Sequence, residues 1–523
     1  MSYSYCRYFF HTILNPDRIN YPIISRSPLS TRAGDSESEG RSSQSLFPVV
    51  QEKTLVILIL LERILELQMD LSTHSTHISR IGIVPSEILS EVFIRCIHFY
   101  VVEDFQSRRF WNKDGILPSY YVISTLIQVS RKWLQTVLAT PLLFTQIIIV
   151  KTIPSMPWNI LHKNLHYSGN LELDICIQDL DAWPRPPCDS FGPLTQNMHR
   201  TRILILDASR HLSMIFPRLQ EILAPRLQYL ELDARSFGLE SDEPCLELGT
   251  LVANRLLRYR SNSSMPLCWN GGLFKANNMK DYCDTHIPKS AKDFVGILQQ
   301  FPLLEKCSLL HFDEEFPLDS SPVINSRLVD LRIDWLYRGS NPTSILWPGL
   351  HFPNLISLVF TMNGWNSNWV HRNLVSAVRS FISFSKPPIK SFSWTGVCMN
   401  VHDLEDLLHT LPLLEALTLR YCSLEPGTMA PLNRKQSPKL GPKIHSLNFT
   451  GTSIPQEELL SAIQSRIERR ADSDLQVLRH AFLQNCGLES DGAIQLSAWT
   501  RQCPGFVAVA DCPRVVSDAY DDE

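Results

Sequence analysis

The second half of the chain repeats one pattern of apolar and polar positions. Apolar residues stand in the first, fourth and sixth places, with mostly polar residues between the fourth and sixth, so each copy predicts a short strand with one buried face. Copies that recur every 24 to 34 residues from Leu304 onward indicate a repeat architecture. The copies begin at Leu227, Leu304, Leu328, Leu355, Ile389, Leu414, Ile444 and Leu478.

Prolines and helical segments lie between these copies. Apolar residues at helical spacing run over residues 291–300, 374–384 and 401–411. Because proline stops a helix and favours extended backbone just before it, a proline after such a segment predicts the boundary to the next strand. Alternating helices and strands predict an α/β solenoid, whose units must stack because one unit cannot bury its apolar face alone. The prolines two residues before a copy are Pro225, Pro302, Pro353, Pro387, Pro412 and Pro442.

Four copies add a small polar residue in the ninth place, and with it the pattern resembles the leucine-rich repeat. These residues are Asn363, Cys422, Thr452 and Cys486. A small polar side chain in the bend after a strand can satisfy backbone groups that the turn leaves unpaired. We therefore expect Cys422 and Cys486 to be structural, and to be neither nucleophiles nor metal ligands.

The third, fifth and seventh places of each copy should line the opposite, concave face of the solenoid. That face is small and hydroxyl-rich in its middle and carries mixed charge toward its start, with no cluster of three arginines for a phosphorylated peptide. It predicts a binding face for a protein of unknown identity, although a face that is merely solvated is the alternative. The candidate binding residues there are Tyr229, Glu231, Asp330, Arg332, Asp334, Thr418, Arg420 and Asn448.

Three apolar blocks stand in order before the repeats. They read I-V-P-S-E-I-L-S-E-V-F over residues 83–93, L-I-Q-V-S-R-K-W over 126–133 and L-A-T-P-L-L-F over 138–144. The spacing predicts one helix after Pro85 and a second over about 123–138. Helices this short cannot bury all of these apolar groups against each other, which argues for a partner surface. The alternative is a helical core that the rest of the chain covers.

These blocks resemble an F-box, and the whole chain is similar to fungal-type F-box proteins with degenerate leucine-rich repeats. The matching residues include Glu87 and Pro141. The resemblance implies docking on a Skp-type adaptor, and through it on a cullin, as the substrate-recognition subunit of a ubiquitin ligase. A leucine-rich-repeat scaffold with no ligase role is the alternative. The residues that the resemblance assigns to the adaptor are Pro85, Ile88, Leu89, Val92, Phe93, Val129, Trp133, Leu142 and Phe144.

The predicted fold is therefore a small helical F-box module followed by an irregular α/β leucine-rich-repeat solenoid. Its parts are a disordered tail over 1–50, one helix or short coiled coil over 52–71, the helical module over 80–150, the solenoid over 153–515 and an acidic tail over 516–523.

Composition narrows the function further. A net charge of -4 gives no basic bias toward nucleic acid, and the longest apolar run, 55–61, is too short to cross a membrane. Thirteen cysteines without a C-x-x-C pair favour reduced thiols in the cytoplasm or nucleus. The common hydrolase, nucleotide-binding and zinc-protease motifs are missing, and the pairs His74 with His77 and Cys283 with His286 lack a second pair of ligands. We expect no enzymatic activity, no cofactor and no metal.

Overall fold

The computed structural model describes a helical segment and a long repeat array. The described residues are 84–101, 119–149, 157–178, 191–207, 212–217, 220–233, 246–263, 267–269, 275–289, 291–312, 323–336, 350–363, 371–436, 440–468 and 477–510. They fall into a small unit of residues 84–95 and 127–136 and a large unit that holds the rest. The segments predicted over 1–50, 52–71 and 516–523 lie outside the described residues.

Three helices cover the first apolar blocks. They are α3 (Ser86–Val101), α4 (Ser119–Val129) and α5 (Arg131–Leu138). The prediction of a single helix over 123–138 is wrong, because the helix is interrupted at Ser130. The Ser130 hydroxyl accepts a hydrogen bond from the Trp133 backbone N–H at 3.2 Å, so this serine caps a new helix and does not continue the old one.

Contacts between the first half of α3 and α5 hold the small unit together. The Phe93 and Trp133 rings lie 4.9 Å apart, and the Lys132 ammonium donates to the Val84 carbonyl oxygen at 2.6 Å. Leu89 and Phe93 are buried.

The large unit contains one fourteen-stranded sheet in which every neighbouring pair is parallel and the strands stand in chain order. Parallel neighbours need a crossover between them, which is the geometry of a repeat solenoid. The predicted α/β repeat array is thus confirmed. Its strands are β1 (Gln146–Ile149), β2 (Leu173–Ile177), β3 (Thr201–Asp207), β5 (Tyr229–Asp233), β8 (Arg258–Ser261), β10 (Asp281–Lys289), β11 (Lys306–Phe312), β13 (Asp330–Leu336), β15 (Ser357–Asn363), β16 (Ser391–Thr395), β18 (Ala416–Arg420), β20 (Ser446–Thr450), β21 (His480–Gln484) and β22 (Val507–Ala510).

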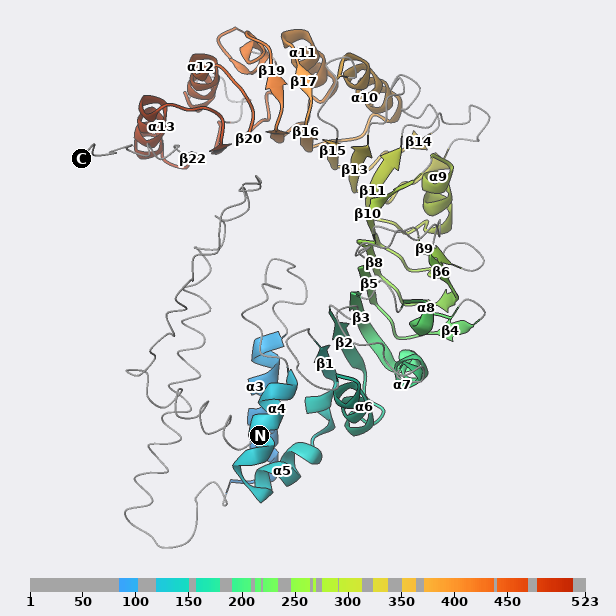
Figure 1. Cartoon of the computed structure of the whole chain (residues 1–523). Helices are drawn as coiled ribbons and strands as arrows, with labels where there is room; N and C mark the ends of the chain where they lie inside the picture. Colours follow the sequence, from blue (N-terminus) through green and yellow to red (C-terminus); the bar gives the residue numbers. More distant parts are fainter. Residues whose placement is uncertain are drawn as a thin grey trace, which may run out of the picture. The chain divides into compact units, whose positions relative to one another are not determined.

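Helices cover one side of this sheet (Figure 1). The helices predicted over 291–300, 374–384 and 401–411 are present as α9, α10 and α11. The crossovers also form four short parallel pairs, β4 (Glu221–Leu223) with β7 (Thr250–Val252), β6 (Leu246–Leu248) with β9 (Leu267–Trp269), β12 (Val323–Ile324) with β14 (Leu350–His351) and β17 (Cys398–Met399) with β19 (Ser423–Leu424). The helices are α6 (Pro157–Tyr167), α7 (Gly192–Gln196), α8 (Leu212–Ile215), α9 (Ala291–Gln300), α10 (His371–Ser385), α11 (Val401–Thr410), α12 (Gln456–Ile467) and α13 (Ser490–Gln502).

The core runs between the sheet and the helices. The fourth and sixth places of the repeats supply it, as Leu417 and Leu419 of β18 and Leu447 and Phe449 of β20 show, since all four are fully buried. Each such side chain stabilises the fold by about 1.5–3 kcal/mol relative to exposure. The eight predicted copies account for eight of the fourteen strands, and β1, β2, β3, β8, β10 and β22 lie outside them.

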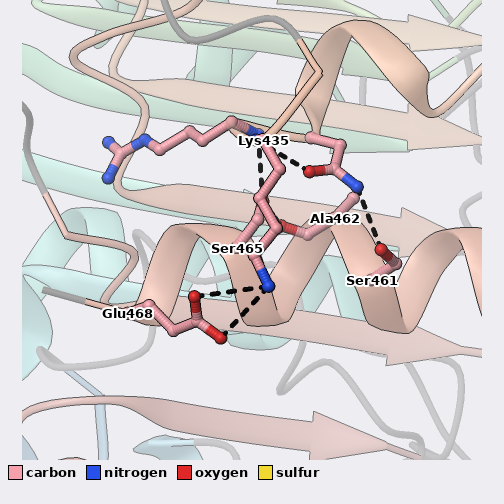
Figure 2. Close-up of polar contacts among 7 residues, drawn as sticks. Lys435, Ser461, Ala462, Ser465 and Glu468 are labelled. Carbon is pink, nitrogen blue, oxygen red and sulfur yellow. Dashed lines mark hydrogen bonds and ion pairs between the residues drawn. The ribbon is translucent and has the colours of Figure 1, made fainter. Parts of the chain in front are cut away.

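Several crossovers have no α-helix among the described residues, and the one from β18 to β20 is held by side chains of a neighbouring helix. Between β19 and β20 the chain forms only a 3-10 turn, Ala430–Leu432, and an irregular loop that lies against α12 (Figure 2). Polar contacts replace the hydrogen bonds that a helix would make for itself. They join the Asn433 amide to the Ser461 hydroxyl at 2.9 Å, the Arg434 backbone N–H to the Ser465 hydroxyl at 3.0 Å and the Lys435 ammonium to the Glu468 carboxylate at 3.5 Å.

Arg466 of α12 completes the attachment of this loop. Its guanidinium is fully buried and donates to the carbonyl oxygens of Leu432 at 2.6 Å, Gly441 at 2.9 Å and Leu440 at 3.1 Å. Burial and, to a smaller extent, the neighbouring Arg434 together lower the pKa of Arg466 to about 9. The three carbonyls and Arg466 are called the carbonyl clamp below.

Candidate functional site

The side of the sheet away from the helices is called the strand face. The third, fifth and seventh places of the repeats lie on it, because the fourth and sixth places between them are buried on the helix side. The structure therefore places all eight predicted binding residues on this face. It brings Thr418, Arg420 and Asn448 together on adjacent strands, whereas Tyr229 and Glu231 on β5 lie well apart from them along the sheet.

The strand face carries paired charges from β2 to β13. Arg202 bonds both carboxylate oxygens of Asp174, at 2.9 and 2.5 Å, and Arg332 bonds Asp334 at 3.0 Å. The Tyr229 hydroxyl donates to Glu231, which is buried. The charges of Asp174 and Asp334 are thus compensated by arginines within the face.

Farther along this charged stretch, Asp281 of β10 faces several charged neighbours. Burial raises the pKa of Asp281, while Arg260 and Arg258 oppose that shift. The carboxylate thus depends on arginines of the adjacent strand for its charge.

A hollow of about 460 Å³ lies at the other end of the strand face, where β18, β20, β21 and β22 end. Its rim exposes two aromatic side chains, Tyr421 at 56% and Phe482 at 39%. The sequence prediction included Arg420 and Asn448 but missed the rest. The signal was Phe482, an aromatic residue in a place where the three preceding repeats carry the small polar residues Ser393, Thr418 and Asn448. This hollow, called the C-terminal hollow below, is lined by Arg420, Tyr421, Asn448, Thr450, Phe482, Leu483, Gln484 and Val509.

Tyr421 has an unusual backbone conformation. The residue that directly follows each strand here has a positive φ, namely 77° at Gly396, 50° at Tyr421, 60° at Gly451 and 53° at Asn485. Glycine and asparagine adopt this left-handed region easily, whereas tyrosine does so at a cost of about 1–3 kcal/mol. Tyr421 is therefore the strained member of the series.

Gly451 makes room for the Tyr421 ring. A Cβ atom at Gly451 would lie 2.5 Å from Cδ1 of Tyr421, so the ring lies directly on the glycine backbone. The backbone itself holds both residues, because the Tyr421 N–H donates to the Thr450 carbonyl at 2.6 Å and the Gly451 N–H donates to the Gln484 carbonyl at 2.7 Å. The ring position is thus built into the repeat.

Three of the four ninth-place residues bond backbone carbonyls in the bend as predicted, and the side chain of the fourth, Asn363, lies outside the described residues. The Cys422 thiol lies 3.3 Å from the Arg420 carbonyl oxygen and 3.6 Å from the Trp394 carbonyl oxygen of the preceding strand. Thr452 repeats the arrangement at 3.3 and 3.1 Å, and Cys486 repeats it at 3.4 and 3.2 Å. Burial raises the pKa of Cys422 to about 11, so its thiol stays protonated near neutral pH.

No group of three or more His, Cys, Asp or Glu side chains gathers as metal ligands within the described ranges. His74, His77 and the side chain of His286 lie outside them.

The residues assigned to the adaptor divide into exposed and buried sets. On α3, Ile88 is 55% and Val92 43% exposed, while Leu89 and Phe93 next to them are buried. Pro85, Val129 and Leu142 are also exposed, and Trp133 is partly buried against Phe93. Phe144 is buried with its ring 5.1 Å from that of Tyr167 on α6. Apolar residues that the sequence could not separate thus differ in accessibility.

The comparisons with known proteins assign no family to this chain. No family model matches the chain and no curated protein matches it, so the F-box resemblance rests on the sequence blocks alone. Chains of solved structures do match, among them that of the "Crystal structure of TLR13-ssRNA13 complex", at 14% identity and a TM-score of 0.21, covering 66% of this chain. This chain spans about half, 53%, of that one. Across the described residues, no helix is long and apolar enough to cross a membrane. The fold itself, argued from strand order and register, is an α/β repeat solenoid.

Proposed function

We propose that this chain is a non-catalytic substrate receptor of a Skp-cullin-F-box-type ubiquitin ligase. In this proposal the first helical segment docks on the Skp-type adaptor, and the strand face of the solenoid binds the target protein. The observation that carries the proposal is the exposure of Ile88 and Val92 on the helix that begins the F-box-like blocks.

Helix α3 has more apolar surface than its own unit uses. Phe93 packs on Trp133 of α5 and Leu89 is buried, while Ile88 and Val92 remain exposed to water beside them. Burying a side chain of this size against a partner would contribute about 1.5–3 kcal/mol. Two such side chains one helical turn apart support a docking strip on α3.

The strand face supports the second half of the proposal. Fixed backbone and outward side chains from adjacent strands form an extended surface that can hold a protein. A receptor of this kind would accelerate ubiquitin transfer by holding a target lysine near the conjugating enzyme, which raises its effective concentration. Its own residues would make and break no bond.

The test is binding of the full chain to a purified Skp-type adaptor. Ile88→Asp together with Val92→Asp should abolish binding, because both side chains are exposed and their replacement leaves Leu89 and Phe93 in place. The matched control is Glu91→Ala with Arg95→Ala, which removes an exposed 2.8 Å ion pair from the same helix and should leave binding unchanged.

Leu89 and Trp133 are poor choices for this test, since one is buried and the other packs on Phe93. Their substitution would unfold the unit whether or not it docks. If the wild-type chain shows no adaptor binding, the ligase assignment is wrong, and a leucine-rich-repeat interaction scaffold without a ligase role takes its place.

A further inference from the structure

We infer that the C-terminal hollow is where the target docks, and that it takes an extended segment in which an acidic side chain stands beside an apolar one. The carboxylate would bind Arg420, and the apolar side chain would lie between Tyr421, Phe482 and Val509. This inference rests on the part of the proposed function that makes the strand face a protein-binding surface, and it needs no ubiquitin ligase.

Charge is the first argument. Arg420 is exposed, and its guanidinium forms no ion pair with any other described residue, whereas Arg202 and Arg332 on the same face are paired with Asp174 and Asp334. No residue that lines the hollow is acidic. A hollow with one unpaired cation and no carboxylate is complementary to an acidic group, and arginine binds carboxylates through two parallel hydrogen bonds.

The exposed apolar rim is the second argument. Tyr421, Phe482 and Val509 are 56%, 39% and 48% exposed, and they surround the same hollow as Arg420. Aromatic residues and arginine are the side chains most often responsible for binding energy at protein interfaces. An acidic group alone would leave these three side chains in water, so the ligand needs an apolar group next to its carboxylate.

The strain at Tyr421 is the third argument, independent of the other two. Glycine holds the same place in the neighbouring repeats, at Gly396 and Gly451, and would relieve the left-handed backbone. More than half of the Tyr421 side chain is exposed, so the folded chain gains little from it in return. Strained conformations of this kind concentrate at binding sites. A ligand in the hollow would supply the missing contacts.

Polar groups that line the hollow fit a polypeptide. Asn448, Thr450 and Gln484 line it and offer amide and hydroxyl groups, with Thr450 already donating to the Asn448 side-chain oxygen at 3.2 Å. Amides can both donate to and accept from the backbone of an extended chain. The volume of about 460 Å³ lies within the usual range for ligand sites, roughly 300–1,000 Å³.

The test is selection of phage-displayed random dodecapeptides on the full-length chain, followed by fluorescence-polarisation titration of the enriched peptides. We expect enrichment of Asp or Glu next to a leucine or an aromatic residue. Tyr421→Asn should weaken binding of the selected peptides at least about tenfold. Asparagine suits this place because Asn485 already occupies it in the next repeat with a φ of 53°, so the thermal midpoint of the variant should stay close to that of the wild type.

Arg420→Glu provides the sharper result. It should abolish binding of the acidic peptides, and a fresh selection on this variant should enrich lysine or arginine in their place. The matched control is Arg379→Gln, which removes an exposed arginine of α10 that is paired with Asp406 and lies on the helix side, and it should leave the peptide affinity unchanged. Arg332→Gln, on the strand face, tests the charged stretch instead.

Three outcomes would overturn the inference: no enrichment, enrichment without acidic residues, or peptides that bind the Tyr421→Asn and Arg420→Glu variants as well as the wild type. If Arg332→Gln weakens binding of the selected peptides and the variants of the hollow do not, the peptides bind the charged stretch of the strand face. The strand face would then still bind targets, but the C-terminal hollow would not be the site. The adaptor experiment is independent of both results, so failure of the ligase assignment would be seen separately.

Discussion

Replacing Arg466 with methionine should loosen the crossover between β18 and β20. The arginine is fully buried and donates to three carbonyl oxygens, of Leu432, Leu440 and Gly441. Methionine has a similar apolar stem, so the substitution removes the donors and leaves only a small cavity. Among the described residues, the Leu432 and Leu440 carbonyls have no other donor to take over, while that of Gly441 also accepts the Ile444 N–H.

The magnitude follows from two opposing effects. A buried acceptor that loses its donor costs about 1–3 kcal/mol, so the loss at the Leu432 and Leu440 carbonyls costs at least about 2 kcal/mol, whereas the Gly441 carbonyl keeps the Ile444 N–H at 3.2 Å. Removing the charge offsets part of this, since burial lowers the pKa of Arg466 and so shows that the folded state holds the cation at a penalty. We expect the hydrogen bonds to dominate and the net destabilisation to be about 2–4 kcal/mol.

Arg466→Lys separates geometry from charge. A lysine keeps the cation but has one nitrogen, whereas the clamp uses three nitrogens of a planar group on three carbonyls. Lysine should therefore fail to rescue the loss seen with methionine. If lysine restored wild-type stability, the buried charge and not the fork geometry would be responsible.

Hydrogen exchange measured by mass spectrometry is the suitable assay, because a repeat array can open locally without unfolding as a whole. Amides of the 440–468 segment should exchange faster in the methionine variant, while those of α9 in a distant repeat should keep their wild-type rates. Unchanged exchange over 440–468 would refute the reasoning and would mean that water or other groups satisfy the three carbonyls.

Two further predictions concern the core of the repeats. The raised pKa of Cys422, about 11 against 9.0 for a free thiol, means that the folded state holds this proton more tightly, so its contribution to stability is full below pH 9 and is lost as the pH rises toward 11. Between pH 8 and 10 the free energy of unfolding of the wild type, measured by denaturant titration, should therefore fall by about 1 kcal/mol more than that of Cys422→Thr, which has no thiol to ionise. Threonine occupies the same place at Thr452. An equal fall in the wild type and the variant would contradict the assigned pKa. Trp394 is fully buried with its ring 5.5 Å from that of Phe392, so Trp394→Ala should cost about 3–5 kcal/mol in the same assay. Trp394→Phe should cost clearly less stability than Trp394→Ala, because the indole N–H donates a hydrogen bond to no described residue and phenylalanine keeps most of the ring. Equal losses of stability in the phenylalanine and alanine variants would show that the N–H does make a stabilising hydrogen bond.

The repeat strands could be predicted from the chain because their pattern is local. Each strand is specified by apolar residues within six positions, as Leu414, Leu417 and Leu419 illustrate, and all three are fully buried. The ninth-place role of Cys422 was also predictable, since its thiol reaches a carbonyl only two residues back. Local spacing carries this information without knowledge of the neighbouring repeats.

Six of the fourteen strands lie outside the repeat copies, and two of them, β8 and β10, escaped because their buried places hold other residue types. In β8 the fourth and sixth places are Tyr259 and Ser261, and in β10 they are Tyr282 and Asp284, yet all four are buried. The Tyr259 and Tyr282 rings lie 5.3 Å apart across the two strands, and the Tyr282 hydroxyl reaches Asp284 at 3.5 Å. Contacts between neighbouring strands allow these tyrosine, serine and aspartate side chains to be buried in the core. A pattern based on leucine spacing cannot predict such contacts.

By itself, the sequence determined that this protein is a stack of helix and strand units with one apolar face per strand, because that property depends on spacing within each unit. It also suggested the F-box-like blocks, whose role stays a prediction. Only the tertiary structure decided that the C-terminal hollow exists and that Arg466 holds a loop. Both combine side chains from different repeats, and the stacking register of the sheet alone brings Arg420, Phe482 and Val509 to one place.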